Sequence, residues 1–323
     1  MAHTRVYRGG ALAAEGFPID DVSEYLGDPD NTVWVDVCEP DRGELEKISA
    51  ELGLHSLAVE DAVHRRQRPK LDVYDEHLFF TAYAVSLDEA TGELGAYEVA
   101  AFVTRSALIT VRQADRFDIS AVTGRWDSVP DLARYGVGYL LHGLIDYVVD
   151  SHFDAVQDLD EQIEALEDAL FDDRPDDALV QRRTFELRKS LVTLRRVVLP
   201  MREVVNSLLR RDLKVINPEM GPYYQDVYDH VLRATEWTES LRDLISTILE
   251  THLSLRGNRL NVIMKQVTSW AAIIAVPTAV TGFYGQNVPY PGFGHWSGFL
   301  VSTLVIVVLS GGLYWVFRRK GWI

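Results

Sequence analysis

Residues 267–284 read VTSWAAIIAVPTAVTGFY, and residues 296–317 read WSGFLVSTLVIVVLSGGLYWVF; neither stretch contains a charged side chain. A helix that crosses a bilayer needs roughly 20 predominantly apolar residues, so the second stretch is long enough alone and the first is long enough with its flanks. A buried hairpin in a soluble core is the alternative, but such cores rarely need two uncharged stretches of this length. We therefore predict two transmembrane helices within residues 263–323.

Charge is divided unequally between this segment and the rest of the chain. The 323 residues include 32 Lys and Arg against 48 Asp and Glu, a formal net charge of −16. Residues 263–323 contain no acid and four bases, so residues 1–262 hold 28 bases and 48 acids, a net of −20. Because phosphate contacts need a basic surface, this composition argues against a nucleic-acid partner. The single Cys38 excludes an intrachain disulfide framework and suits a reducing compartment.

The bases that flank the two uncharged stretches predict their orientation. Lys265 precedes the first stretch, and Arg318, Arg319 and Lys320 follow the second. The connecting loop, residues 287–296, contains neither Lys nor Arg. The positive-inside rule therefore predicts a multi-pass protein of the cell membrane, with both termini in the cytoplasm and only this loop outside.

Residues 1–130 have the pattern of a cytoplasmic α/β domain. Three segments rich in β-branched and aromatic residues predict strands, namely 32–37, 78–87 and 99–111. Thr91-Gly92 marks a turn between the last two, which predicts a hairpin. Short helices are predicted between strands, at residues 44–54 and 56–64.

Residues 131–262 change in character and predict long helices. Apolar residues recur at helical spacing over 135–170 and 177–211, which indicates two antiparallel helices joined at residues 172–175. The many acids around that joint indicate either a solvated helix face or a surface that concentrates cations. From Tyr223 no proline occurs until Pro277, and a helix over residues 223–283 would be roughly 90 Å long. The first span should thus continue into the cytoplasm as a stalk.

The predicted fold class is therefore an α+β membrane protein in three parts. An N-terminal cytoplasmic α/β domain occupies residues 1–130, and long cytoplasmic helices including the stalk occupy residues 131–262. Two C-terminal transmembrane helices within residues 263–323 complete the chain.

One face of the predicted long helix carries a polar stripe. Steps of three and four residues trace this face, which reads Asp226, Asp229, Arg233, Glu236, Ser240, Asp243, Thr247, Glu250, Ser254, Gly257, Asn261, Met264, Thr268, Ala271, Ala275, Thr278, Gly282 and Gly285. The stripe is largely acidic below the membrane, and inside the membrane it is small or polar except at Met264. Close helix packing also favours small residues in membranes, but the unbroken phase favours a pore lining. Because one helix cannot enclose a pore, this interpretation requires an oligomeric ring.

The first span closes with the motif Tyr284-Gly285-Gln286-Asn287. A Tyr-Gly-x-Asn at the end of the first of two C-terminal spans, followed by a basic C-terminus, resembles the CorA family of divalent-cation transporters. Three further segments are similar to family segments, so the resemblance covers most of the chain; they are HRRQRPK at 64–70, YQDVYDH at 224–230 and NVIMK at 261–265.

The resemblance implies a homopentamer whose first span lines the pore and whose second span surrounds it. Five copies of Asn287 would form an amide ring at the outer mouth. Mg²⁺ gives up its water reluctantly, and an amide oxygen can accept hydrogen bonds from that hydration shell without removing it. Conduction also needs binding weak enough for release. The resemblance assigns further positions, all within the polar stripe, to the lower pore site (Asn261), an acidic stalk position (Glu250) and the pore wall (Met264, Ala275, Thr278 and Gly282).

The family also carries a cytoplasmic sensor at the subunit interface, made by one acid of the α/β domain and one of the stalk. The matching positions are Asp88 and Asp226. Bound Mg²⁺ would neutralise carboxylates that otherwise repel each other, so its loss at low internal Mg²⁺ should open the pore. Mg²⁺ is then both cargo and regulator, and no organic cofactor is implied. An ordinary surface acid is the alternative at each position.

Two departures from the family pattern leave the transported ion open. Gln286 stands where the family usually has Met, and the loop after the motif lacks its usual acid. Co²⁺, Ni²⁺ or Zn²⁺ thus remain candidates beside Mg²⁺, and a zinc transporter of the same superfamily is an alternative. His295 could favour such ions, although a lone interfacial His is more often structural.

Two other classes of function compete with transport. A membrane-anchored metal sensor would use the same cytoplasmic acids without Asn287, but it would not need a polar stripe through the membrane. An enzyme is disfavoured because the chain has no Gly-x-x-x-x-Gly-Lys phosphate loop and no His-Glu-x-x-His motif. We therefore predict a transporter and not an enzyme, driven by the membrane potential and the concentration gradient.

Overall fold

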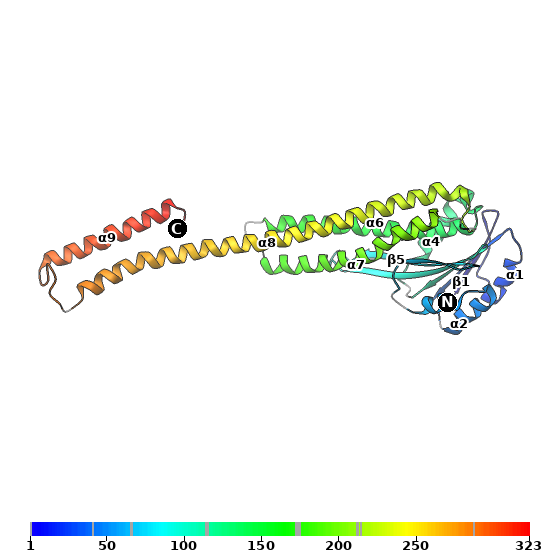
Figure 1. Cartoon of the computed structure of the whole chain (residues 1–323), viewed down its shortest axis with the longest axis horizontal. Helices are drawn as coiled ribbons and strands as arrows, with labels where there is room; N and C mark the ends of the chain where they lie inside the picture. Colours follow the sequence, from blue (N-terminus) through cyan, green and yellow to red (C-terminus); the bar gives the residue numbers. More distant parts are fainter. Residues whose placement is uncertain are drawn as a thin grey trace. The chain divides into compact units, whose positions relative to one another are not determined.

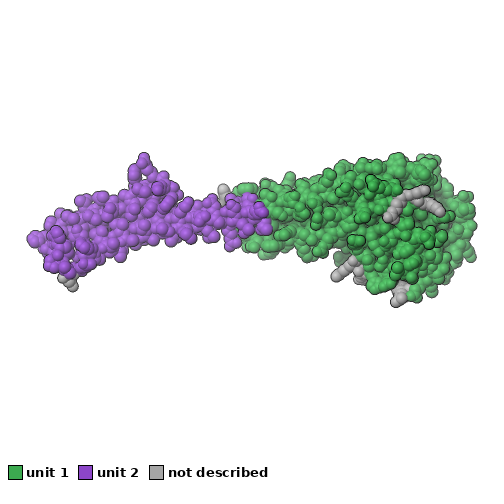
Figure 2. Space-filling view, viewed as in Figure 1, with its two compact units in different colours: residues 1–248 green, residues 249–323 purple. Residues whose placement is uncertain are grey.

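The computed structural model describes residues 2–40, 42–64, 67–113, 116–171, 176–210, 213, 215–286 and 288–323. The chain forms two compact units, Met1–Ile248 and Leu249–Ile323 (Figure 2).

The first unit contains one mixed sheet. Its strands are β1 (Ala2–Arg8), β2 (Ala11–Glu15), β3 (Asn31–Cys38), β4 (Lys70–Val73), β5 (Leu78–Leu87), β6 (Leu94–Val103) and β7 (Ala107–Arg112). They are ordered β2-β1-β3-β7-β6-β5-β4. Neighbouring strands pair antiparallel except β3 and β7, which pair parallel with Val33 opposite Ala107.

Both faces of the sheet are buried. Successive side chains of a strand point to opposite faces, so Val33 and Phe79 lie in one core cluster and Trp34 and Phe80 in the other. The first cluster is completed by three short helices, α1 (Val22–Leu26), α2 (Arg42–Leu52) and α3 (Ser56–Val63). The second includes side chains of α4 (Ile119–Ser128), of the long helices α6 (Val137–Leu170) and α7 (Asp177–Arg210), and of the start of α8 (Gly221–Tyr284). Figure 1 shows α6 and α7 running along this face.

Short segments complete the connections of the first unit. They are η1 (Ile19–Asp21), α5 (Pro130–Ala133) and η2 (Pro218–Met220). The predicted helices over 135–170 and 177–211 are confirmed as α6 and α7. The buried residues of α7, and those of α6 from Val148 onward, recur at helical spacing, as the sequence pattern indicated. The first turns of α6, Val137–Ile145, are buried on nearly every side. The predicted joint at residues 172–175 lies outside the described residues.

One predicted strand is wrong. The segment 99–111 is not continuous, because the chain reverses between β6 and β7, where Val103 pairs with Leu108. Thr104 closes this reversal: its backbone N–H donates to the Ala107 carbonyl, and its Oγ1 accepts from the Ala107 N–H at 2.9 Å. The predicted hairpin through Thr91-Gly92 is confirmed, and it joins β5 to β6.

The second unit contains the C-terminal part of α8 and the helix α9 (Trp296–Arg319). The rings of Trp270 and Tyr314 lie 6.4 Å apart, which fixes the antiparallel register of the two helices. Among the described residues, these two helices are long and apolar enough to cross a membrane, with mean hydropathies of 1.4 and 2.1 in their most apolar windows. Only 6% and 0% of those windows is buried, unlike the core helices of soluble proteins.

Candidate functional site

Helix α9 covers one side of the membrane-spanning part of α8. The positions of α8 between Ser269 and Tyr284 that are buried or half-buried lie on one side of the helix: Ser269, Ala272, Ile273, Val276, Pro277, Val280 and Tyr284. A position two residues further along a helix lies about 200° around its axis. The stripe positions Ala271, Ala275, Thr278 and Gly282 each follow one of these residues by two, so they lie on the opposite side of α8.

Every described stripe position predicted to line the pore is exposed within this chain. These residues are Glu250, Asn261, Met264, Thr268, Ala271, Ala275, Thr278 and Gly282. The Thr278 hydroxyl donates to the Ile274 carbonyl at 3.0 Å, which satisfies its proton inside the helix and leaves its oxygen able to accept. The side of α8 away from α9 therefore presents small and polar groups and no partner within the described chain.

The end of α8 lies at the predicted selectivity motif. The helix ends at Tyr284, and the Gly285 N–H still donates to the Thr281 carbonyl at 2.8 Å. A Cβ atom on Gly285 would lie 2.9 Å from that carbonyl oxygen, so the close approach requires glycine. Gln286 is exposed, and Asn287 lies outside the described residues.

An aromatic cluster that the sequence analysis missed supports the loop beside the motif. The Tyr284 ring lies 4.8 Å from that of Tyr290, which in turn lies 5.2 Å from that of Phe293. The loop is also joined closely to the start of α9, where a Cβ atom on Gly298 would lie only 2.6 Å from the Gly292 carbonyl oxygen. Spacings of six and three residues give no helical or strand period, so only the folded loop reveals the cluster.

His295 has a structural partner in this loop. Its Nδ1 lies 3.1 Å from the Phe293 carbonyl oxygen. This hydrogen bond agrees with the structural interpretation of a lone interfacial His.

Asp88 lies at the tip of the β5–β6 hairpin and organises that turn. Its Oδ1 accepts from the backbone N–H groups of Ala90 and Thr91, both at 3.0 Å. The hydrogen bond from Thr91 is the largest cause that holds the pKa of Asp88 below its usual value, and the charge of Arg183 acts in the same direction. The carboxylate is exposed and charged at neutral pH.

Asp226 lies on the exposed side of the first turns of α8. Its neighbours Tyr224 and Val227 are buried, and the Tyr224 hydroxyl donates to the Gly138 carbonyl of α6 at 2.8 Å. This anchoring turns Asp226 outward, and its side chain is 73% exposed. Its Oδ2 lies 3.7 Å from Nδ1 of His230, one turn further along the helix.

The two predicted sensor acids are not brought together within one chain. The carbonyl next to Asp88, that of Glu89, is contacted by Gln162 near the end of α6. Asp226 faces the other end of α6, where its charge acts on His142. Twenty residues of helix separate Gln162 from His142, which is about 30 Å. Both acids supply the hard oxygen ligands that Mg²⁺ prefers, but a single ion can bind both only if they come from different copies.

No cluster of three or more His, Cys, Asp or Glu side chains with metal-site geometry occurs in the part of the chain that the structure describes. An acidic surface does lie beside β5: Asp150, Asp154 and Asp158 line a cavity of about 260 Å³. Partial burial and the neighbouring acids Glu89 and Asp154 raise the pKa of Asp158. Arg125 also lines this cavity and pairs with Asp150 at 2.7 Å, which neutralises one of the three acids. The remaining pair, Asp154 and Asp158, agrees with a surface that concentrates cations.

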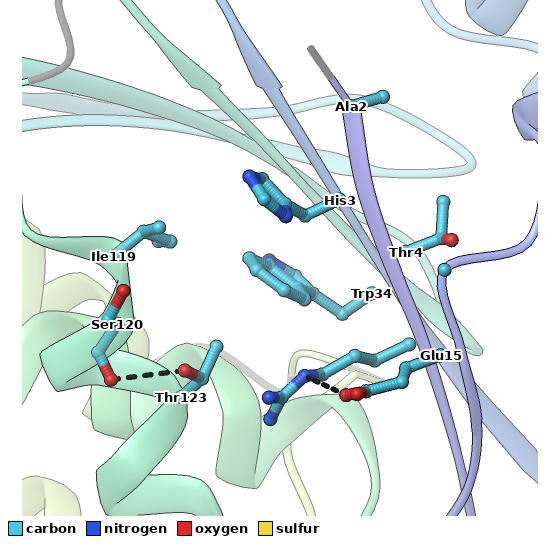
Figure 3. A pocket seen from close by; sticks show the side chains of 10 residues that line it. Ala2, His3, Thr4, Glu15, Trp34, Ile119, Ser120 and Thr123 are labelled. Atoms are coloured by element: carbon cyan, nitrogen blue, oxygen red, sulfur yellow. Dashed lines mark hydrogen bonds and ion pairs between the residues drawn. The ribbon is translucent and has the colours of Figure 1, made fainter.

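A separate cavity lies between β1 and the start of α4. It has a volume of about 380 Å³, and His3, Trp34, Ser120 and Thr123 are among its lining residues (Figure 3). Arg5 borders it, but Glu15 at 3.3 Å and Asp127 at 2.8 Å already neutralise this base. None of the predicted site residues lines this cavity.

Known proteins resemble this chain in both sequence and fold. A family model described as CorA-like Mg²⁺ transporter protein matches residues 29–319. The chain is 30% identical over 319 residues to the cobalt/magnesium transport protein CorA of Thermotoga maritima, covering 95% of this chain and 88% of that protein. It is 27% identical over 325 residues to the protein of the same name from Methanocaldococcus jannaschii, covering 97% and 98%. The solved CorA magnesium transporter from Methanocaldococcus jannaschii shares the fold, with a TM-score of 0.79 at 23% identity, covering 100% of this chain and 99% of that one.

Proposed function

The chain belongs to the CorA-like Mg²⁺ transporter family, and from this premise we propose that it forms a homopentameric pore for Mg²⁺ in the cell membrane. As a family member it is a divalent-cation transporter with two membrane-spanning helices. The finer proposal concerns the pore, its gate and its ion. Helix α8 lines the pore, α9 surrounds it, and the membrane potential drives the ion into the cytoplasm.

One observation carries this proposal above the others. Helix α9 covers the side of α8 at Ser269, Ile273 and Val276, and the stripe through Ala271, Ala275 and Thr278 faces the opposite way. Lipid-facing positions have no need of small or polar residues. In a ring of identical chains, the uncovered stripe can face the symmetry axis while α9 faces the lipid. The sensor-only alternative offers no role for this arrangement.

The proposed pathway uses a different chemistry at each level. Asn287 forms the outer amide ring together with Tyr284, Gly285 and Gln286, and it accepts hydrogen bonds from hydrated Mg²⁺. Thr278 and Thr268 offer hydroxyl oxygens inside the membrane, and Asn261 forms the lower site. Glu250 then receives the ion in the stalk, where the acids of the polar stripe raise the local cation concentration.

The proposed gate depends on Asp88 and Asp226 of neighbouring copies. Asp88 is held ionised by its own turn, and Asp226 is held outward by the anchored start of α8. An ion between them would relieve the repulsion of two carboxylates, so the ring is stable and closed when internal Mg²⁺ is high. Loss of the ion favours separation of the copies and opening.

The same proposal assigns each part of the chain to the membrane or to one side of it. Residues 1–130 and 131–262 lie in the cytoplasm, residues 263–323 form the membrane domain, and residues 287–296 form the external loop. The bases at the ends of both spans support this orientation.

Reconstituted liposomes that enclose a Mg²⁺-sensitive dye test the proposal. Under an inside-negative potential we expect Mg²⁺ entry, and Asn287→Ala should reduce it at least tenfold. Ile274→Ala is the matched control, because Ile274 lies on α8 but off the stripe, and it should retain most of the entry. Entry that survives Asn287→Ala would contradict the amide ring, and passage of Zn²⁺ in place of Mg²⁺ would favour the zinc branch. If no cation passes a correctly folded protein, the anchored-sensor alternative holds.

A further inference from the structure

The chain after α9 folds back onto the helix end. Gly321 takes the left-handed conformation, with φ of +65°. The Trp322 N–H donates to the Phe317 carbonyl at 2.9 Å, and the Gly321 N–H donates to that of Arg318 at 3.2 Å. These two bonds define a Schellman motif, in which the residue after the glycine also packs against the helix. The rings of Trp322 and Phe317 do so, stacked 5.6 Å apart at an angle of 8°. The C-terminus is thus an ordered cap.

This cap holds three consecutive bases against aromatic rings. The Arg319 guanidinium lies 4.6 Å from the centre of the Trp315 ring, and Lys320 Nζ lies 5.6 Å from that of Trp322. Arg318 donates to the Tyr314 hydroxyl at 3.3 Å. An aromatic ring attracts a cation without neutralising its charge. In the described part of the chain none of these three bases forms an ion pair, so they are available to an anion from outside this chain.

A fourth base, Lys265, lies level with these three along the axes of the two helices. The Trp270–Tyr314 contact sets the two helices level with each other. Lys265 is five residues from Trp270, and Arg319 is five residues from Tyr314, so both lie about 7.5 Å beyond that contact. No acid occurs anywhere in residues 263–323. Four positive charges per chain are therefore concentrated where the uncharged spans end.

We propose that this cap is a binding site for the headgroups of anionic phospholipids, formed by Arg318, Arg319 and Lys320 and bordered by Trp315 and Trp322. Arginine binds phosphate through paired N–H groups, and lysine adds a point charge. Trp side chains prefer the headgroup level of a bilayer, and Trp315 is 58% exposed. A zwitterionic headgroup offers the same phosphate with a compensating cation, so the site discriminates by net charge.

The Schellman cap has a specific part in this site. Without it, Lys320 and Trp322 would lie beyond the last ordered turn of α9, and their ordering would have to occur on binding. With it, the three bases point from a fixed helix end whose own C-terminal carbonyls also favour cations. The cap thus preorganises the cationic surface.

Lipid titration of the full-length protein in detergent, followed by native mass spectrometry, tests the proposal. Phosphatidylglycerol is the anionic probe and phosphatidylcholine the zwitterionic one. We expect the wild type to prefer phosphatidylglycerol, and the triple variant Arg318→Gln, Arg319→Gln, Lys320→Gln to lose roughly tenfold or more of that affinity. Trp322→Ala keeps all charges but removes the stack, so it should lose less.

The matched control removes three exposed bases from α7, as Arg182→Gln, Arg188→Gln and Arg196→Gln, and should keep the wild-type preference. If the triple variant fails to fold, the wild type alone tests the proposal. Its affinity for phosphatidylglycerol should fall with increasing NaCl. Equal affinity of the wild type for both lipids would overturn the proposal. Carboxylates of another copy that occupied the bases would produce this result. Displacement of phosphatidylglycerol by equimolar inorganic phosphate would indicate a free-anion site and would also overturn it.

Discussion

Asp36 and Arg112 form a completely buried ion pair between two parallel strands. Arg112 Nη2 donates to Asp36 Oδ2 at 2.7 Å, and the Thr110 hydroxyl donates to Oδ1 at 2.8 Å. We expect Asp36→Ala to destabilise the protein by about 3–5 kcal/mol, because it removes the carboxylate that accepts hydrogen bonds from Nε and Nη2 of a buried, charged guanidinium. Thermal unfolding of the detergent-solubilised protein measures the effect.

The control for this pair is an exposed one. Asp127 pairs with Arg5 at 2.8 Å, but its side chain is 43% exposed. Asp127→Ala should therefore cost less than about 1 kcal/mol. Similar losses in the two variants would contradict the argument from burial.

His152 gives a prediction for pH. It is buried, its Nε2 lies 2.7 Å from the Tyr83 carbonyl oxygen, and burial lowers its pKa to about 4. In the unfolded chain a histidine has a pKa of about 6.5. Between these values the unfolded state binds more protons, so the stability is complete above about pH 6.5 and falls as the pH drops toward 4.

The slope of this loss is at most about 1.4 kcal/mol per pH unit for one such group. Burial also lowers the pKa values of His77 and His142, which add to the loss in the same direction. His152→Gln should flatten the dependence of the unfolding temperature on pH between 4 and 6.5, and the same change at exposed His3 should not. An unchanged slope in His152→Gln would show that other groups govern acid unfolding.

Among the helices, two glycine-to-alanine substitutions are expected to have opposite effects on stability. A Cβ atom on Gly298 would meet the Gly292 carbonyl oxygen at 2.6 Å, whereas one on Gly257 of α8 would meet no atom within 4 Å. We expect Gly298→Ala to cost about 1–3 kcal/mol, since two backbone segments must separate. Gly257→Ala should stabilise by up to about 1 kcal/mol, because alanine favours a helix interior. Calorimetry of both variants checks the pair, and a stabilised Gly298→Ala would contradict the close packing at the start of α9.

The elements that could be predicted from sequence are those with a strong period or composition. Helices α6 and α7 have long 3.6-residue patterns, and α9 has 22 uncharged positions. Strand β1 was missed because its polar residues Thr4, Arg5 and Arg8 leave only Val6 and Tyr7 as a short apolar segment. The β6–β7 reversal was missed because a three-residue turn without Gly or Pro leaves two apolar strands reading as one.

The candidate site also has features that could be predicted from the sequence and features that could not. The polar stripe was predictable because it depends on helical phase alone. The position of α9 opposite the stripe was not, since no pattern in one helix says where its neighbour packs. The contacts of Tyr284, Tyr290 and Phe293 also depend on the folded loop. The separation of Asp88 from Asp226 could not be predicted, because it depends on both the length of α6 and the position of the β5–β6 hairpin along it.

For the whole molecule, Asp88 and Asp226 of one chain lie near positions of α6 that are about 30 Å apart, which predicts cross-linking only between chains. In a Cys38→Ser background, we expect Asp88→Cys combined with Asp226→Cys to give a ladder of up to five linked chains with a thiol-specific reagent of about 10 Å reach. Denaturing gel electrophoresis shows the ladder. Each single cysteine variant should stay monomeric on the same gel. A double variant that stays monomeric would contradict the shared site between copies.

The proposed transport, driven by the membrane potential, makes a quantitative prediction for the assembled molecule. Moving one charge across 100 mV is worth about 2.3 kcal/mol, so a divalent ion gains roughly twice that on entry. At equilibrium the internal-to-external ratio of free Mg²⁺ in sealed liposomes should rise tenfold for about every 30 mV of inside-negative potential, because two charges cross together. Potassium diffusion potentials of different size, set with valinomycin, measure this slope with the internal dye. A ratio independent of potential would mean electroneutral exchange, and a tenfold rise per roughly 60 mV would mean that only one net charge moves with each ion.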